Sequence, residues 1–193
     1  MKIEQLQGAL TFLKEAERLK DVLRSSHTSS GRAESTAEHS WRLCLMAMLF
    51  EDAFADIDFA KLLKICVIHD LGEAIGGDIP AVEQHPDQHK SAQERRDLLT
   101  LLAPLEIDQQ ARFVGLWDEY EHASSPEARL VKGLDKLETI LQHNQGLNPD
   151  NFDYGFNLSY GQKHTATHPL FIALRQLLDQ ETRARAAARD ADR

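Results

Sequence analysis

The chain has 193 residues, 42% of them hydrophobic, and its 22 basic and 31 acidic side chains leave a formal net charge of −9. This composition is typical of a soluble globular protein and excludes a disordered chain, a collagen-like fibre and a disulfide scaffold. The acidic balance argues against a surface that binds nucleic acid, but it is compatible with a small anionic substrate.

Targeting signals are missing from the sequence as given. The N-terminal residues 1–5 do not resemble a secretory leader, and no apolar run approaches the ~20 residues of a membrane span. We therefore expect a cytosolic protein that does not associate with membranes. Cys44 and Cys66 lie in apolar stretches, where reduced core thiols are the expected state.

Apolar residues recur at helical spacing through nearly the whole chain. We expect helices over residues 3–23, 36 to 50 or 54, 59–70, 88–102, 108–122, 126–145 and from 169 onward, the last one fraying from residue 182. Residues 146–168 are rich in Gly, Asn, Pro and Asp and predict an irregular loop. The pattern predicts a single all-α domain over residues 1–193, with its core at about 19–145.

Several helix starts carry recognisable capping signals. Ser35 and Glu38 have the spacing of a capping box, and Asp58 can cap the helix that begins at Phe59. Ser125 followed by Pro126 is a typical helix start, with proline in the first turn.

Four side chains of metal-ligand type occur on three of these helices. His69 and Asp70 stand side by side at the end of the most apolar helix, and His39 lies early in the preceding one. Asp135 interrupts an otherwise apolar helix, where an unpaired carboxylate is costly to bury. Two imidazoles and two carboxylates suit one divalent transition ion such as Mn, Co, Fe, Ni or Zn. The alternative is that they are unrelated polar residues near helix ends.

Glu73 follows Asp70 by three residues and His69 by four. If the helix continues, its carboxylate shares their face and could act as a general acid or base. The alternative is a solvated glutamate at a helix end.

Longer motifs around these residues resemble a known family. Residues 34–42 (ESTAEHSWR), 69–80 (HDLGEAIGGDIP) and 131–136 (VKGLDK) are similar to the 5′-deoxynucleotidase branch of the HD-domain metal-dependent phosphohydrolases, and 116–121 (LWDEYE) resembles its eukaryotic members. The resemblance implies an all-helical HD fold in which the metal ligands are His39, His69, Asp70 and Asp135.

The resemblance also implies roles for residues around the metal. Glu73 would be the catalytic acid or base, and Asp78 a second functional carboxylate near the substrate. Arg24 stands fifteen residues before the first ligand, where the bacterial members have an arginine that grips the phosphate, and Arg32 matches a recurrent basic position. Ser25 replaces a tryptophan that helps the family to exclude ribonucleotides.

Other polar residues are weaker candidates for phosphate or metal binding. Arg42 lies about one turn after His39 and could reach a phosphate, or could form a salt bridge instead. His85 and His89 are four residues apart and could bind a second metal, but a solvated helix start explains them better.

The resemblance predicts a hydrolase of nucleoside 5′-monophosphates that forms a homodimer. An alternative is a hydrolase of alarmones or cyclic nucleotides. Ala74 disfavours the alarmone reaction, because those enzymes typically carry an aspartate directly after the glutamate. A second alternative, a non-catalytic nucleotide-sensing module, is disfavoured by the intact ligand set and by Glu73.

Overall fold

The computed structural model of the protein describes residues 2–83 and 90–191. The described part is mainly helical, which confirms the predicted fold class. Its helices are α1 (Ile3–Ala16), α2 (Thr36–Leu49), α3 (Phe59–Ile68), α4 (Glu73–Gly76), α5 (Lys90–Leu102), α6 (Ile107–His122), α7 (Pro126–Gln145), α8 (Tyr154–Asn157), α9 (Gln162–Thr165) and α10 (Pro169–Ala191). Short 3₁₀ turns cover Glu17–Lys20, Glu51–Ala53 and Ala81–Glu83. Strands β1 (Leu23–His27) and β2 (Ala33–Ser35) pair antiparallel.

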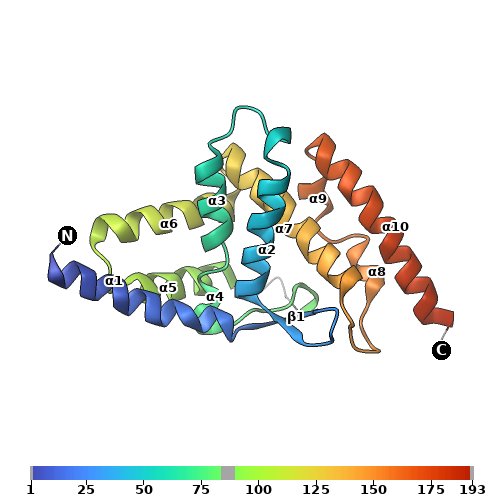
Figure 1. Ribbon diagram of the computed structural model, residues 1–193, viewed down its shortest axis with the longest axis horizontal. Coiled ribbons are helices and arrows are strands. Elements are labelled where there is room, and N and C mark those ends of the chain that lie inside the picture. The colour runs from blue at the N-terminus through green and yellow to red at the C-terminus, as the bar shows by residue number, and fades with distance from the viewer. Residues whose placement is uncertain (1, 84–89, 192–193) are drawn as a thin grey trace.

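Helices α2, α3 and α7 form the middle of an elongated molecule (Figure 1). Helices α1, α5 and α6 extend from one end, and α8, α9 and α10 lie at the other, so the two termini are far apart (Figure 1). Helix α7 contacts α2, α3, α6, α9 and α10, which makes it the central element of the fold. None of the helices in the described ranges is long and apolar enough to cross a membrane.

Two apolar clusters hold these groups of helices together. One joins α2, α3, α7 and α10 through fully buried residues such as Leu43, Leu62, Leu134 and Phe171. The other joins α1, α5 and α6 around Leu98, Leu102 and Trp117 and reaches the end of α3. The site described below lies where these two groups of helices meet.

The predicted capping signals are confirmed. Ser35 Oγ accepts from the backbone N–H of Glu38, whose carboxylate accepts in turn from the Ser35 backbone, completing the capping box of α2. Asp58 caps α3 by accepting from the Lys61 backbone, and Ser125 caps α7 by accepting from the Ala128 backbone. These bonds set where α2 and α7 begin, and so the position of their site residues.

The predicted helix over residues 3–23 is wrong beyond Ala16, where the chain passes through a 3₁₀ turn into β1. Helical spacing alone did not reveal that residues 23–35 fold back as a hairpin. Its tight turn is made possible by Gly31, whose φ of +83° is rarely adopted by other residues. Arg24 therefore lies on a strand rather than at a helix end.

Further boundaries differ from the sequence prediction. Helix α2 ends at Leu49, and the helix expected to fray from residue 182 continues in α10 to Ala191. Helix α3 ends at Ile68, so His69 and Asp70 follow it instead of lying inside it. Residues 146–168, predicted to be irregular, contain α8, whose start is capped by Asp153, and α9, which follows Gly161 at a φ of +66°. His85 and His89 lie outside the described residues.

Candidate active site

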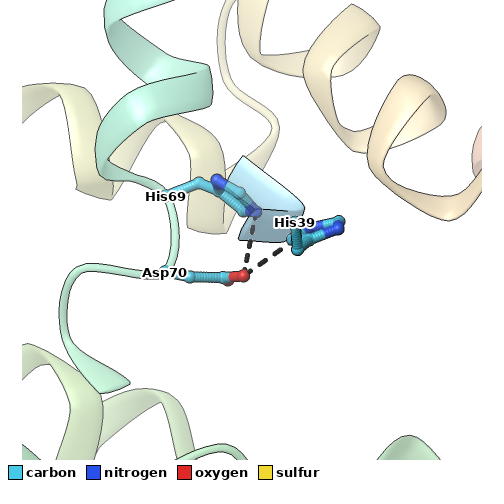
Figure 2. A group of neighbouring side chains, drawn as sticks. All are labelled: His39, His69 and Asp70. Atoms are coloured by element: carbon cyan, nitrogen blue, oxygen red, sulfur yellow. Dashed lines mark ion pairs between the residues drawn. The ribbon is translucent and has the colours of Figure 1, made fainter. Parts of the chain in front are cut away.

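His39, His69 and Asp70 converge from different elements at one buried point. His39 lies in the first turns of α2, whereas His69 and Asp70 leave the end of α3 (Figure 2). Their potential ligand atoms all lie within 4.8 Å of one another. Asp70 Oδ2 is 3.1 Å from His69 Nε2 and 3.8 Å from His39 Nε2 (Figure 2).

Asp135 joins this group from the middle of α7. Its Oδ1 lies 3.2 Å from His39 Nε2. Its other oxygen, Oδ2, accepts a hydrogen bond of 2.6 Å from the Tyr120 hydroxyl and lies 2.9 Å from Lys136 Nζ. One carboxylate oxygen is thus held by neighbours, while the other faces the histidines.

Both imidazoles are oriented so that Nε2 faces the cluster. Nδ1 of His69 donates to the Cys66 carbonyl at 2.8 Å, and Nδ1 of His39 donates to the buried Glu138 carboxylate. A nitrogen that donates carries the proton, so a ring that binds an ion in its neutral form has its lone pair on Nε2. Burial and Arg24 lower the pKa of His39, but Glu138 and Asp135 outweigh them and raise it to about 10, so an ion bound at His39 Nε2 would displace a proton. Among the described residues neither Nε2 has a hydrogen-bond partner, although both atoms are buried.

The two aspartates remain ionised despite their burial. Burial by itself raises the pKa of Asp70, but His69 and His39 outweigh it and lower that pKa. Burial likewise raises the pKa of Asp135, and Lys136 and His39 lower it far below its ordinary value. Two carboxylates and two inward-facing nitrogen lone pairs are a donor set that suits a divalent transition ion.

A cavity of about 1060 Å³ opens beside this cluster. His69, Asp70 and Asp135 lie in its wall, together with Glu73 and Asp78. Cationic side chains from three elements, β1, α5 and α7, also line it, namely Arg24, Lys90, Arg95, Lys132 and Lys136. An acidic protein therefore presents a local group of positive charges beside the candidate metal site, as binding of a small anion requires.

Arg24 reaches this cavity from β1. Its guanidinium lies 3.6 Å from Asp70 and 3.5 Å from Glu34, and Nη2 donates to Thr139 Oγ1 at 3.1 Å. Glu34 is buried and its pKa is raised to about 6, mainly by burial, with a further contribution from Glu138. Contacts on three sides hold the Arg24 guanidinium beside the candidate ligand Asp70.

Glu73 begins the short helix α4 and is almost fully buried. Its oxygens accept from Thr36 Oγ1 and Lys90 Nζ, each at 3.3 Å. Burial raises the pKa of Glu73 to about 9, and the charges of Asp70 and Asp78 add to the effect. Lys90 Nζ also lies 3.9 Å from Asp78, so a single ammonium links the two carboxylates that the sequence placed near the substrate.

Two predicted substrate-binding arginines do not reach the cavity. Arg32 is exposed and forms a bidentate pair with Glu38 on the surface. Arg42 Nε donates to Glu138 at 2.6 Å, and Nη1 donates to Gln145. Arg42 lies three residues after His39 on α2, and both side chains bond to Glu138. Arg42 therefore orients Glu138 and does not line the cavity.

Sequence reasoning missed several residues of this site. Glu138, which orients His39, is one turn after Asp135 in the apolar helix α7 and could have been found as a second buried carboxylate. Tyr120 of α6 binds Asp135 across helices, Lys136 binds it from the next position of α7, and Lys90 of α5 binds Glu73. Tyr120 and Lys136 lie within the motifs 116–121 and 131–136, which could have singled them out, whereas Lys90 lies in none.

The family model described as "HD domain" matches residues 16–174. This covers most of the sequence, and the chain belongs to the HD-domain family. The match includes the region whose motifs suggested the family, and His39, His69, Asp70 and Asp135 all lie within it.

Individual relatives extend over most of the chain. The chain is 30% identical to a Danio rerio protein named 5′-deoxynucleotidase HDDC2, over 95% of this chain and 92% of that protein. It is 37% identical to a Schizosaccharomyces pombe protein named 5′-deoxynucleotidase hdd1, over 68% of each. A crystal structure described as a predicted metal-dependent phosphohydrolase from Magnetospirillum magnetotacticum superimposes with a TM-score of 0.78 at 28% identity and 95% coverage of both chains.

Proposed function

We propose that this protein is a metal-dependent 5′-deoxynucleotidase, which hydrolyses deoxyribonucleoside 5′-monophosphates to nucleoside and phosphate. The observation that carries the proposal is the cluster of His39, His69, Asp70 and Asp135, of which the last three line a cavity that cations also line. The names of the relatives support this reaction class and this substrate.

The proposed ligands of one divalent ion are His39 Nε2, His69 Nε2, Asp70 and Asp135. A divalent ion held by them supplies positive charge for a phosphoryl oxygen and lowers the pKa of water. Glu138 and the Cys66 carbonyl hold the two imidazoles in the orientation that such an ion needs, because ligand histidines depend on partners at their second nitrogen.

Residues of the cavity wall would carry the other parts of the reaction. Arg24 binds two phosphate oxygens through its planar guanidinium. A water oxygen forms the new bond to phosphorus, the bond to the 5′-oxygen breaks, and that oxygen takes up a proton. Glu73 is the proposed proton-transfer group, and Lys90 holds it in place. Asp78 would position the substrate beside it.

We also propose that the protein is a cytoplasmic homodimer that does not bind nucleic acid. Helix α2 is buried on the side of His39 and Leu43 but exposes an apolar stripe on the other side. The stripe consists of Trp41, Leu45, Met48 and Leu49, which are 43–77% exposed. These positions follow helical spacing, and an exposed apolar face of this kind favours association with a second copy.

The function is tested by phosphate release from ribo- and deoxyribonucleoside 5′-monophosphates with Mn, Co, Fe, Ni or Zn. We expect deoxyribonucleotides to be hydrolysed, with chelation abolishing the activity. Absence of phosphate release with every metal would contradict the proposal. Because Ser25 lines the cavity where the family has a tryptophan, ribonucleotides belong in the same screen.

The ligand set is tested by the metal content of Asp135→Ala. Purified wild-type protein should hold about one transition ion per chain, and the variant should lose both ion and activity, because an ionised ligand is removed. Asp118→Ala is the control, since Asp118 pairs with Arg95 by its carboxylate and should leave the ion bound. Metal content unchanged in Asp135→Ala would refute this ligand set.

A further inference from the structure

The cavity has an aromatic wall that the proposed reaction does not use. Phe152, Phe156, Tyr160 and His143 line it, and none of them is a candidate metal ligand. The Tyr160 ring centroid lies 5.1 Å from Lys136 Nζ, which pairs with Asp135, so this wall begins beside the metal ligands. The rings form two pairs: Phe152 lies 4.8 Å from His143, and Phe156 lies 5.4 Å from Tyr160, measured between ring centroids. We call these four residues the aromatic wall.

The position of the aromatic wall relative to the metal ligands follows from α7. Asp135, Thr139 and His143 are spaced four residues apart on this helix, so they lie along one face, and all three line the cavity. Eight residues of α-helix rise about 12 Å. An extended mononucleotide has a similar length from its phosphate to the far edge of its base. Arg24 contacts Thr139, between the two ends.

His143 offers an unused hydrogen-bond acceptor at the far end. Its Nδ1 donates to Asn157 Oδ1 at 2.9 Å, which leaves the lone pair on Nε2. Within the described part of the chain this buried Nε2 has no partner. Burial, aided by Arg24, lowers the pKa of His143 to about 4, so the ring is neutral at physiological pH and Nε2 can accept.

The aromatic wall is fixed in place by buried hydrogen bonds. Arg175 of α10 donates to the carbonyls of Asn157, Leu158 and Tyr160, which span the turn between α8 and α9. Asn148 donates to the Tyr154 hydroxyl and to the His143 carbonyl, which ties the segment to the end of α7. A preformed wall binds a flat ligand without an ordering cost.

From these observations we propose that the aromatic wall is the nucleobase subsite of the cavity. This inference rests on the proposed function, and it assigns a binding site to the base of the nucleotide, which the proposed reaction leaves without one. The base stacks on Phe156, and His143 Nε2 accepts a hydrogen bond from an N–H group on the base edge. Each nucleobase carries such a group. The subsite therefore favours ligands that carry a base, without distinguishing one base from another.

The test compares two substrates that share the sugar phosphate. Deoxyadenosine 5′-monophosphate carries a base, and 2-deoxyribose 5-phosphate does not. In Phe156→Ala we expect KM for the nucleotide to rise about 10-fold with kcat little changed, and KM for the sugar phosphate to stay the same. A tenfold change corresponds to about 1.4 kcal/mol, which is within the range for stacking of a base on an aromatic ring.

Conservative and control variants separate stacking from folding. Phe156→Tyr keeps the aromatic face and should retain the wild-type KM, whereas Phe156→Leu keeps apolar bulk without that face and should behave like Phe156→Ala. Phe113→Leu removes a ring from the pair with Phe12, away from the cavity, and should leave both KM values unchanged. Equal effects of Phe156→Ala on both substrates, or none on either, would overturn the subsite.

Binding of deoxyadenosine, which has no phosphate, separates the subsite from the reaction. Calorimetric binding that Phe156→Leu weakens would support the subsite even if no nucleotide were hydrolysed, and the proposed function would then fail alone. Hydrolysis of nucleotides with the same KM in Phe156→Leu and wild type would retain the function and refute the subsite. If deoxyadenosine does not bind and no nucleotide is hydrolysed, both the subsite and the proposed function are refuted.

Discussion

At the scale of single residues, Glu73 is the carboxylate on which proton transfer is proposed to depend. It is held by Thr36 and Lys90 in the wall of the cavity, three residues after Asp70. Glu73→Gln keeps the shape of the side chain but cannot transfer a proton. We expect the variant to keep its fold and its metal while kcat falls by at least ~100-fold, the usual scale for general acid–base catalysis.

Phosphate release and metal content together check this prediction. Glu119→Gln is the matched control, because Glu119 pairs with Lys61 away from the cavity and its loss should leave kcat unchanged. Turnover of Glu73→Gln near the wild-type value would return Glu73 to a structural role.

Arg24 is the arginine that the structure brings to the candidate metal site. A guanidinium can bind a phosphate through two parallel hydrogen bonds, and lysine cannot copy that geometry. Since charge-assisted hydrogen bonds contribute roughly 1.5–3 kcal/mol each, Arg24→Lys should raise KM clearly and Arg24→Ala should raise it further. Both should keep the metal.

Steady-state kinetics and metal analysis check the Arg24 prediction. Arg96→Ala is the control, since Arg96 is exposed, bonds to Gln93 and does not line the cavity. Unchanged kinetics in Arg24→Ala would show that another cation binds the phosphate, with Lys90 and Lys136 the first candidates in this cavity.

At the scale of elements, helix α7, which carries Asp135, packs closely against α10. Gly133 permits this approach, because a Cβ at that position would lie 2.4 Å from Phe171 Cε2. Gly133→Ala should therefore lower the free energy of unfolding by about 1–3 kcal/mol, the usual cost of overpacking. Chemical denaturation measures this change.

Gly115 of α6 provides a matched control for Gly133. A Cβ at Gly115 would meet no described atom within 4 Å, and the residue is exposed. Gly115→Ala should raise the free energy of unfolding by up to about 1 kcal/mol, because alanine favours a helix. A loss of stability in Gly115→Ala, or none in Gly133→Ala, would contradict this account of helix packing.

At the scale of the whole molecule, the exposed stripe on α2 is the proposed contact between two copies of the chain. Leu49→Glu places a charge on its most exposed member, at 77% exposure, so the monomer should still fold. We expect wild-type protein to sediment as a dimer and Leu49→Glu as a monomer, since burial of an unpaired charge is unfavourable.

Sedimentation of a second variant controls for the added charge. Ile107→Glu changes an apolar residue of α6 that is 82% exposed and lies outside the stripe. It should leave the dimer intact. A dimeric Leu49→Glu variant would place the contact elsewhere, and a monomeric wild type would refute the dimer itself.

The sequence by itself determined the helical class, the starts of α2, α3 and α7, and the residues that form the metal-type cluster. Apolar periodicity and capping side chains act within a few residues, so they can be read locally. His39, His69, Asp70 and Asp135 could be recognised because polar ligand types stand out in apolar helices. The organisation into a single domain remains a prediction.

Only the tertiary structure decided how these residues are used. The contacts of Arg24 with Asp70 and Thr139, the carboxylate that binds His39 Nδ1 and the lysine that binds Glu73 depend on segments that are distant in the sequence. The same holds for Arg42, which Glu138 draws away from the cavity. The energy of a buried charge depends on which partners the fold brings to it, and no local pattern contains that information.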